Sequence, residues 1–198
     1  MGLNLEYING QTPLDEDEKE GLLIPTITTR GELNEFEQLN IDETNHWLLG
    51  KKFTSDKALT EKFVKELHKR MFGNVWKWAG EFRTTNKNIG VDKYLIGVEL
   101  KMLLDNAKYW IENNTFPEDE IAVRFSHQIV KIHCFANGNG RHSRMIGDIL
   151  IEKCFGKEPF SWGGKSLTDI SETRTKYISA LKEADENHYQ KLIEFARN

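Results

Sequence analysis

The sequence is short of cysteine and has no long apolar run. Its two cysteines, Cys134 and Cys154, are too few for a disulfide framework and lack metal-ligand spacing, so we expect two unpaired thiols. No stretch approaches the roughly 18 apolar residues of a membrane span, and the beginning of the chain lacks the basic-then-apolar pattern of an export signal. These absences favour a soluble, cytoplasmic protein.

An excess of charge of one sign is also missing. The 198 residues carry 27 basic and 31 acidic side chains, a formal net charge of −4. Such a chain has no global field that would draw nucleic acid or an anionic membrane, so we expect neither as a partner. Any anion must therefore be held by a local arrangement of residues.

Proline is scarce, which leaves room for long helices. After Pro25 the chain has only Pro117 and Pro159. Apolar residues recur at helical spacing, and the residues that carry this pattern are Leu59, Phe63, Leu67 and Met71; Leu100, Leu103, Leu104, Ala107, Trp110 and Ile111; Ile121, Phe125, Ile129 and Ile132; Met145, Ile146, Ile149 and Leu150; and Ile170, Tyr177, Ile178 and Leu181. The pattern predicts an all-α bundle in which these side chains form the core.

Two of the predicted helices have local signals at their ends. Residues 56–72 are expected to form one helix, capped by Asp56 and stopped by Gly73. Pro117 and the acidic residues after it are typical of a helix start.

Two stretches depart from the helical pattern. Residues 81–94 are rich in β-branched and turn residues, which predicts a flap that is either a short β-hairpin or an extended loop. Residues 1–55 form an expected N-terminal arm, in which Thr28 or Thr29 caps a helix-like run. Residues 56–198 then form the main domain.

One segment, His133 to Arg144, reads HCFANGNGRHSR and lies between two predicted helices. Residues 136–139 should form a tight loop that leads into a helix N-terminus. Gly138 and Gly140 let the backbone approach a ligand, and the first turn offers unpaired N–H groups at the positive end of the helix dipole. The segment therefore predicts a site for an anion such as phosphate.

Three side chains would act at this site. Arg141 and Arg144 are three residues apart and share a helix face, so both can grip phosphate oxygens. His133, just before the loop, is placed to take a proton near neutral pH, and a base beside bound phosphate suggests transfer to a hydroxyl. On spacing alone, a purely structural histidine remains an open alternative.

Other interpretations of the histidines and glycines fit less well. The segment lacks the lysine of a Walker loop, and it lacks both the preceding strand and the third glycine of a dinucleotide fingerprint. His142 falls off the face of the two arginines, so we expect it in solvent. The other histidines form no metal-spaced pair, so no zinc site is expected; these are His46, His68, His127 and His188.

The segment resembles the signature of the Fic (Fic/Doc, or Fido) family, H-P-F-x-[DEN]-G-N-G-R-x-x-R. It matches eight of the nine specified positions and misses only the second. The likeness extends from about Ala58 to the C-terminus, through MFGNVWKWAGEFR, VRFSHQIVKIH and KYISALKEADENHYQKLIEFAR. With ITTRGELNEFEQ in the arm, the chain is most similar to the short Fic group called mobile mystery protein B, which is carried on bacterial mobile elements.

The resemblance implies a Fic-type helical bundle with a short β-hairpin flap, and transfer of AMP from ATP to a Ser, Thr or Tyr hydroxyl of a target protein. By the same resemblance, His133 would be the catalytic base and Phe135 would anchor the loop. The expected ligands and partners are ATP, Mg²⁺, a target protein and either a second copy of the chain or an antitoxin.

The remaining site residues also follow from the resemblance. The nucleotide phosphates would be bound by Gly138, Asn139, Gly140, Arg141 and Arg144, the last on the γ-phosphate. Asn137 stands where the magnesium-binding acid usually lies. Asn88, Ile89 and Gly90 would lie in the flap, within about Thr84 to Val91, which aligns the target by strand-like backbone pairing.

Three positions carry residues that are unusual in the family. Cys134 replaces the usual proline, which adds a thiol beside the base and predicts a less rigid loop that is open to oxidation. Asn137 offers an amide oxygen instead of a carboxylate, which predicts weaker binding of Mg²⁺. Residues 28–32 match the family's inhibitory pattern [ST]-x-x-x-E-[GN], except that Leu33 stands where Gly or Asn belongs.

The inhibitory pattern makes Glu32 the expected clamp on Arg144. Glu35 and Glu37 are rival candidates, and a solvated helix face is the alternative for all three. If Glu32 is the clamp, Glu32→Gly should raise auto-AMPylation.

Three functions stay open on the sequence. An AMP transferase is favoured by Gly140, because the family's Doc-type kinases carry a lysine there. A Doc-like protein kinase is the second. The third is a nucleotide-binding partner without turnover in a toxin–antitoxin type module, which the intact His133 disfavours.

Overall fold

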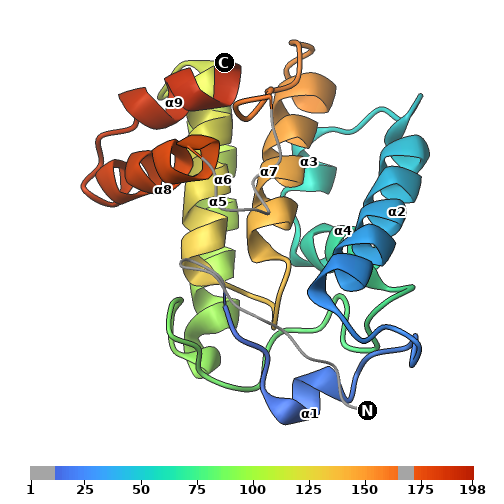
Figure 1. The fold of residues 1–198 in the computed structure, drawn as a ribbon. Coiled ribbons are helices and arrows are strands. Elements are labelled where there is room, and N and C mark those ends of the chain that lie inside the picture. Colours follow the sequence, from blue (N-terminus) through green and yellow to red (C-terminus); the bar gives the residue numbers. More distant parts are fainter. Residues whose placement is uncertain (1–11, 165–171) are drawn as a thin grey trace.

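The computed structural model describes residues 12–164 and 172–198, and this part of the chain is mostly helical (Figure 1). Its elements are α1 (Glu16–Lys19), α2 (Arg30–Leu48), α3 (Ser55–Ala58), α4 (Glu61–Phe72), the 3₁₀ turn η1 (Lys93–Leu95), α5 (Ile96–Glu112), α6 (Glu118–Ile132), α7 (Asn139–Ile149), the π-helical turn η2 (Leu150–Cys154), α8 (Glu172–Asp185) and α9 (Gln190–Arg197). Within the described ranges, β pairing is limited to one isolated bridge between Leu22 and Trp76. The all-α prediction is confirmed.

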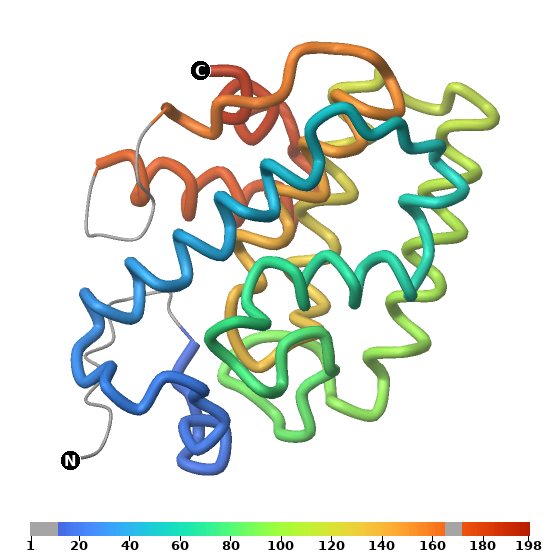
Figure 2. The backbone as a smooth tube through the Cα atoms, turned by 90° about the vertical axis from the view of Figure 1, so that its right-hand side faces the viewer, coloured from blue at the N-terminus to red at the C-terminus, as the bar shows by residue number. Residues whose placement is uncertain are grey.

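Helix α6 lies at the centre of the bundle, with α5 and α7 packed against it (Figure 1). It begins after Pro117 as the sequence predicted. Helices α8 and α9 pack against each other beside it, and α2 packs on α4 (Figure 2). Leu33 and Ile41 of α2 belong to the same buried core as Phe125 of α6 and Ile146 of α7. The N-terminal arm is therefore joined to the bundle by a shared core. None of the helices in these ranges is both long and apolar enough to cross a membrane.

The prediction of a single helix over residues 56–72 is wrong, because the chain forms two helices there, α3 and α4. Leu59 leaves helical geometry with φ −92° and ψ 56°. Thr60 then caps α4, since its Oγ1 accepts the N–H of Phe63 at 3.1 Å. Asp56 lies inside α3 and is not the cap, whereas Gly73 does end α4.

The flap forms the extended loop and not the hairpin. Its two ends pair with the turn after α6 instead of with each other: Arg83 N–H donates to the carbonyl of Cys134 at 2.9 Å, and Val91 N–H donates to that of Ile132 at 3.3 Å. The buried Arg83 guanidinium also donates to the carbonyls of His133 (2.7 Å), Thr85 (2.7 Å) and Val91. Backbone N–H and C=O groups of the flap that would pair in a β-hairpin are therefore already used in these bonds.

Candidate functional site

The turn between α6 and α7 begins and ends in left-handed backbone. His133 closes α6 with φ 58°, and Gly138 precedes α7 with φ 76°. For a residue other than glycine this conformation costs roughly 1–2 kcal/mol. The His133 carbonyl accepts the Nε proton of Arg83 at 2.7 Å, which helps to hold it there. The surrounding structure therefore fixes the position of the candidate base.

Asn139 and Phe135 brace the turn from inside. The Asn139 side chain accepts the N–H of Phe135 at 3.0 Å and donates to its carbonyl at 2.7 Å. The fully buried Phe135 ring stacks on His68 with centroids 3.7 Å apart. Phe135 therefore anchors the turn, as the resemblance implies, and the Asn139 side chain binds the backbone of the turn.

His68 is a supporting residue that no sequence spacing indicated. Its Nδ1 accepts the N–H of Gly80 at 3.0 Å, so the proton of the neutral ring lies on Nε2, which donates to the carbonyl of Asn137 at 3.0 Å. Burial lowers the pKa of His68 well below its usual range. The ring therefore stays neutral and ties α4 to the turn.

His142 was expected in solvent, and this expectation is wrong. The side chain is buried, its Nε2–H donates to the carbonyl of Val64 at 3.0 Å, and burial lowers its pKa to about 4. The other face of α7 carries the arginines, but α4 covers the face of His142.

His133 lies 4% exposed with its Nε2 3.0 Å from the hydroxyl Oγ1 of Thr12. Burial is the main cause that lowers the pKa of His133 to about 4; Arg83 and Lys87 add to it, and the Val130 carbonyl opposes it. The imidazole is therefore neutral at pH 7 and able to accept a proton.

A cavity of about 340 Å³ brings most of the predicted site residues together. Its lining includes Thr12, Ile89, His133, Asn137, Gly138, Asn139, Gly140, Arg141 and Arg144. Gly90 packs directly behind the base, since a Cβ at this position would lie 2.6 Å from that of His133. Asn88 is exposed and does not line the cavity.

The two arginines of α7 have different surroundings. Arg141 forms an ion pair of 2.7 Å with Glu37 and lies over the Phe72 ring. The Glu37 carboxylate is buried and also accepts the Nε1 proton of Trp76 at 2.6 Å. The Arg144 guanidinium lies 5.5 Å from the centre of the Tyr177 ring. Glu37 therefore pairs with Arg141, the first of the two arginines in the segment from His133 to Arg144 (the motif arginines).

Glu32 is not placed as the expected clamp on Arg144. It completes a capping box at the start of α2, where its carboxylate accepts the N–H groups of Thr28 (2.9 Å) and Thr29 (3.0 Å). These bonds lower its pKa, and the side chain faces solvent. No ion pair joins Glu32 to Arg144 within the described part of the chain. Of the two caps that the sequence allowed, Thr28 and Thr29, the structure has Thr29.

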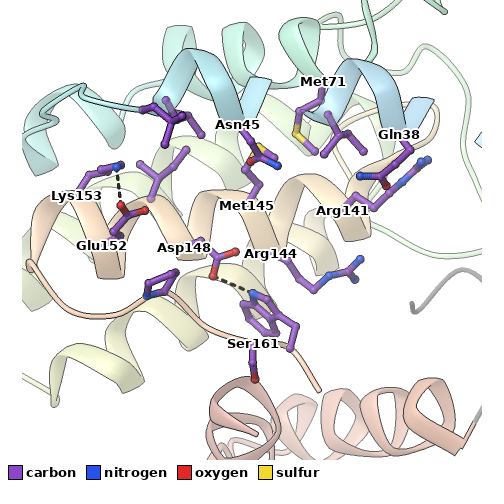
Figure 3. Close-up of a pocket in the computed structure, with 16 residues that line it drawn as sticks. Gln38, Asn45, Met71, Arg141, Arg144, Met145, Asp148, Glu152, Lys153 and Ser161 are labelled. Atoms are coloured by element: carbon purple, nitrogen blue, oxygen red, sulfur yellow. Dashed lines mark hydrogen bonds and ion pairs between the residues drawn. The ribbon is translucent and has the colours of Figure 1, made fainter. Parts of the chain in front are cut away.

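A second cavity, of about 500 Å³, lies between α2, α7 and residues 159–162 (Figure 3). Figure 3 shows Arg141 and Arg144 projecting from α7 at one end of this cavity, with Asp148 further along the helix. Burial raises the pKa of Asp148 to about 7, although its carboxylate accepts the Nε1 proton of Trp162 at 2.9 Å. Arg141 and Arg144 therefore line both cavities.

The residues present do not form a metal cage. Among the residues that the structure describes, no group of three or more His, Cys, Asp or Glu side chains could hold a metal ion. Asn137 offers one amide oxygen, and that oxygen already accepts the N–H of Gly138 at 2.6 Å. The Cys134 thiol is buried, which raises its pKa to about 12, so the expectation of an oxidisable thiol beside the base is wrong.

Together, the fold and the site define a helical domain that can hold phosphate at a helix start beside a neutral base. Residues 58–151 match the Fic/DOC family, and the chain contains a Fic/DOC family domain. It is 27% identical over 141 residues to the protein adenylyltransferase Fic of Drosophila grimshawi and 24% identical over 163 residues to that of Aedes aegypti. These matches cover 69% and 80% of the chain but only 28% and 31% of the relatives.

Solved structures agree on the fold. Fic-1 from C. elegans superposes with a TM-score of 0.67 at 22% identity, over 90% of this chain and 51% of that one. The BepC protein, a VirB-translocated effector from Bartonella tribocorum with bound AMPPNP, superposes with a TM-score of 0.66 at 17% identity, over 92% of this chain and 97% of that one.

Proposed function

We propose that this protein transfers AMP from ATP to a hydroxyl group of a protein. The observation that carries the proposal is the contact between the neutral His133 imidazole and a hydroxyl, in the same cavity as the start of α7 and both motif arginines. The name of the curated relatives, protein adenylyltransferase, supports the same reaction.

In this reaction Nε2 of His133 takes the proton of the target hydroxyl, whose oxygen attacks the α-phosphorus of ATP. The bond between the α-phosphorus and the bridging oxygen breaks, and pyrophosphate leaves. The first-turn N–H groups of α7 have no intrahelical acceptors and would stabilise the charge on the phosphates. Arg141 and Arg144 would hold the phosphate tail.

Two further roles belong to this proposal. A Mg²⁺ ion would be held by the nucleotide phosphates, because Asn137 alone offers it only one engaged amide oxygen. The flap would receive the target segment at Asn88, Ile89 and Gly90. The division into an arm and a domain at residue 56, the cytoplasmic location and an antitoxin or second copy as partner stay predictions.

Incubation with ATP labelled at either the α- or the γ-phosphate, together with cell lysate, tests the reaction. AMP transfer puts the α-label on protein, and this label should vanish with His133→Ala. Label from the γ-phosphate would instead establish a Doc-like kinase. The absence of both labels would leave a binding protein and contradict the proposal.

A further inference from the structure

Thr12 is the hydroxyl that His133 already contacts. Its Oγ1 lies 3.0 Å from Nε2 of the ring, across 121 residues of sequence, and the pair is buried. A neutral ring with its proton on Nδ1 accepts the Thr12 proton at Nε2. This is the contact that a base must make with an acceptor hydroxyl.

The segment that carries Thr12 is held over the site by several bonds. The Thr12 carbonyl lies 3.5 Å from Nδ2 of Asn137. The next residues fasten to the flap, where Asp15 accepts the Thr85 hydroxyl at 2.7 Å and pairs with Lys87 at 2.8 Å. Glu18 pairs with the same buried ammonium. The hydroxyl is therefore presented to the base in a fixed position.

Thr12 also lines the cavity that contains Gly138, Gly140 and the two arginines. The acceptor hydroxyl, the base and the phosphate-binding groups thus meet in one space. Well-oriented intramolecular reactants reach effective concentrations of roughly 10⁵ M and more, so the attached hydroxyl would compete strongly with any separate protein.

We infer that Thr12 is itself an acceptor, and that the protein adenylylates this residue within the same chain. The inference rests on the proposed function. The Oγ1 proton passes to Nε2 of His133, Oγ1 bonds to the α-phosphorus of ATP, and the bond to the bridging oxygen breaks to release pyrophosphate. The product is a threonine phosphodiester of AMP that remains in the cavity and blocks the base.

The test is to incubate the purified full chain with α-labelled ATP at several protein concentrations, without and with lysate. The expected result is one AMP per chain, located on Thr12 by peptide fragmentation. Its rate constant should not change with protein concentration, because the reaction is intramolecular. Thr12→Val should abolish this label and Thr12→Ser should retain it, while the exposed control Thr26→Val should match the wild type.

A variant outside the catalytic site tests the fixed position of the segment. Asp15→Ala removes the carboxylate that accepts the Thr85 hydroxyl and pairs with Lys87, so the label on Thr12 should form several-fold more slowly. Labelling of lysate proteins should not fall in parallel, because the base and the arginines are intact.

The other possible outcomes show which claim fails. Label on lysate proteins with none on Thr12 overturns this inference and leaves the proposed function standing. Label on Thr12 with a rate constant that rises with protein concentration overturns the intramolecular step. No label on any protein overturns the proposed function and the inference together.

Discussion

Replacing Glu37 by glutamine should tighten the binding of nucleotide. In the resting structure the Glu37 carboxylate holds Arg141 at 2.7 Å and accepts the Trp76 proton at 2.6 Å. A bound phosphate must compete for the same guanidinium. Trp76 and Arg141 contact different carboxylate oxygens, Oε1 and Oε2, so the single oxygen of glutamine can stay on Trp76 while the charge that holds Arg141 is lost.

The size of the effect follows from the charge. A hydrogen bond to a charged group contributes about 1.5–3 kcal/mol, and charge-assisted bonds are roughly twice as strong as neutral ones. Loss of the charge therefore weakens the hold on Arg141 by about 1 kcal/mol. Since about 1.4 kcal/mol corresponds to a factor of ten, the Kd for nucleotide should fall about fivefold.

Calorimetric titration with a non-hydrolysable ATP analogue measures this change. The matched control is Glu35→Gln, which removes the same charge from an exposed position on α2 and should leave the Kd near the wild-type value. An unchanged or larger Kd for Glu37→Gln, in a protein that still unfolds cooperatively, would refute the competition between Glu37 and phosphate.

Three other changes have definite expected results. Gly138→Ala should lower the free energy of unfolding in urea by about 1–3 kcal/mol, because φ is 76° and the new Cβ would lie 2.6 Å from the Phe72 ring. Gly140→Ala is the control, because its Cβ would meet nothing closer than 3.8 Å. Equal losses of stability in the two variants would contradict the reasoning. The pKa of His142 is about 4 in the folded protein and 6.5 in the unfolded chain, so between these pH values the unfolded chain binds one more proton. The free energy of unfolding should therefore fall by about 1.4 kcal/mol per pH unit as the pH drops from about 6.5 towards 4. In His142→Gln, the free energy of unfolding measured in urea should depend less steeply on pH in this range. An equal pH dependence in the variant and the wild type would count against a neutral buried ring at position 142. Asn137→Asp should lower the Mg²⁺ concentration needed for half-maximal AMP transfer, because a carboxylate binds Mg²⁺ better than an amide oxygen does. An unchanged Mg²⁺ titration would show that residue 137 does not contact the metal.

The sequence by itself determined the helices and the segment between α6 and α7. Helical spacing of apolar residues, the start at Pro117 and the cap at Thr29 are local signals, because each depends on residues a few positions apart. The order of residues in HCFANGNGRHSR likewise gave the candidate base, both arginines and the glycine before α7.

Tertiary packing decided the contacts that join distant parts of the chain. Glu37, and not Glu32, meets a motif arginine, because Glu32 is used by the cap of its own helix whereas Glu37 faces the core. His142 is buried because α4 covers its side of α7. Thr12 reaches His133 across 121 residues. No local pattern encodes such a contact, since it depends on where the folded bundle leaves a space beside the base and on which segment fills it.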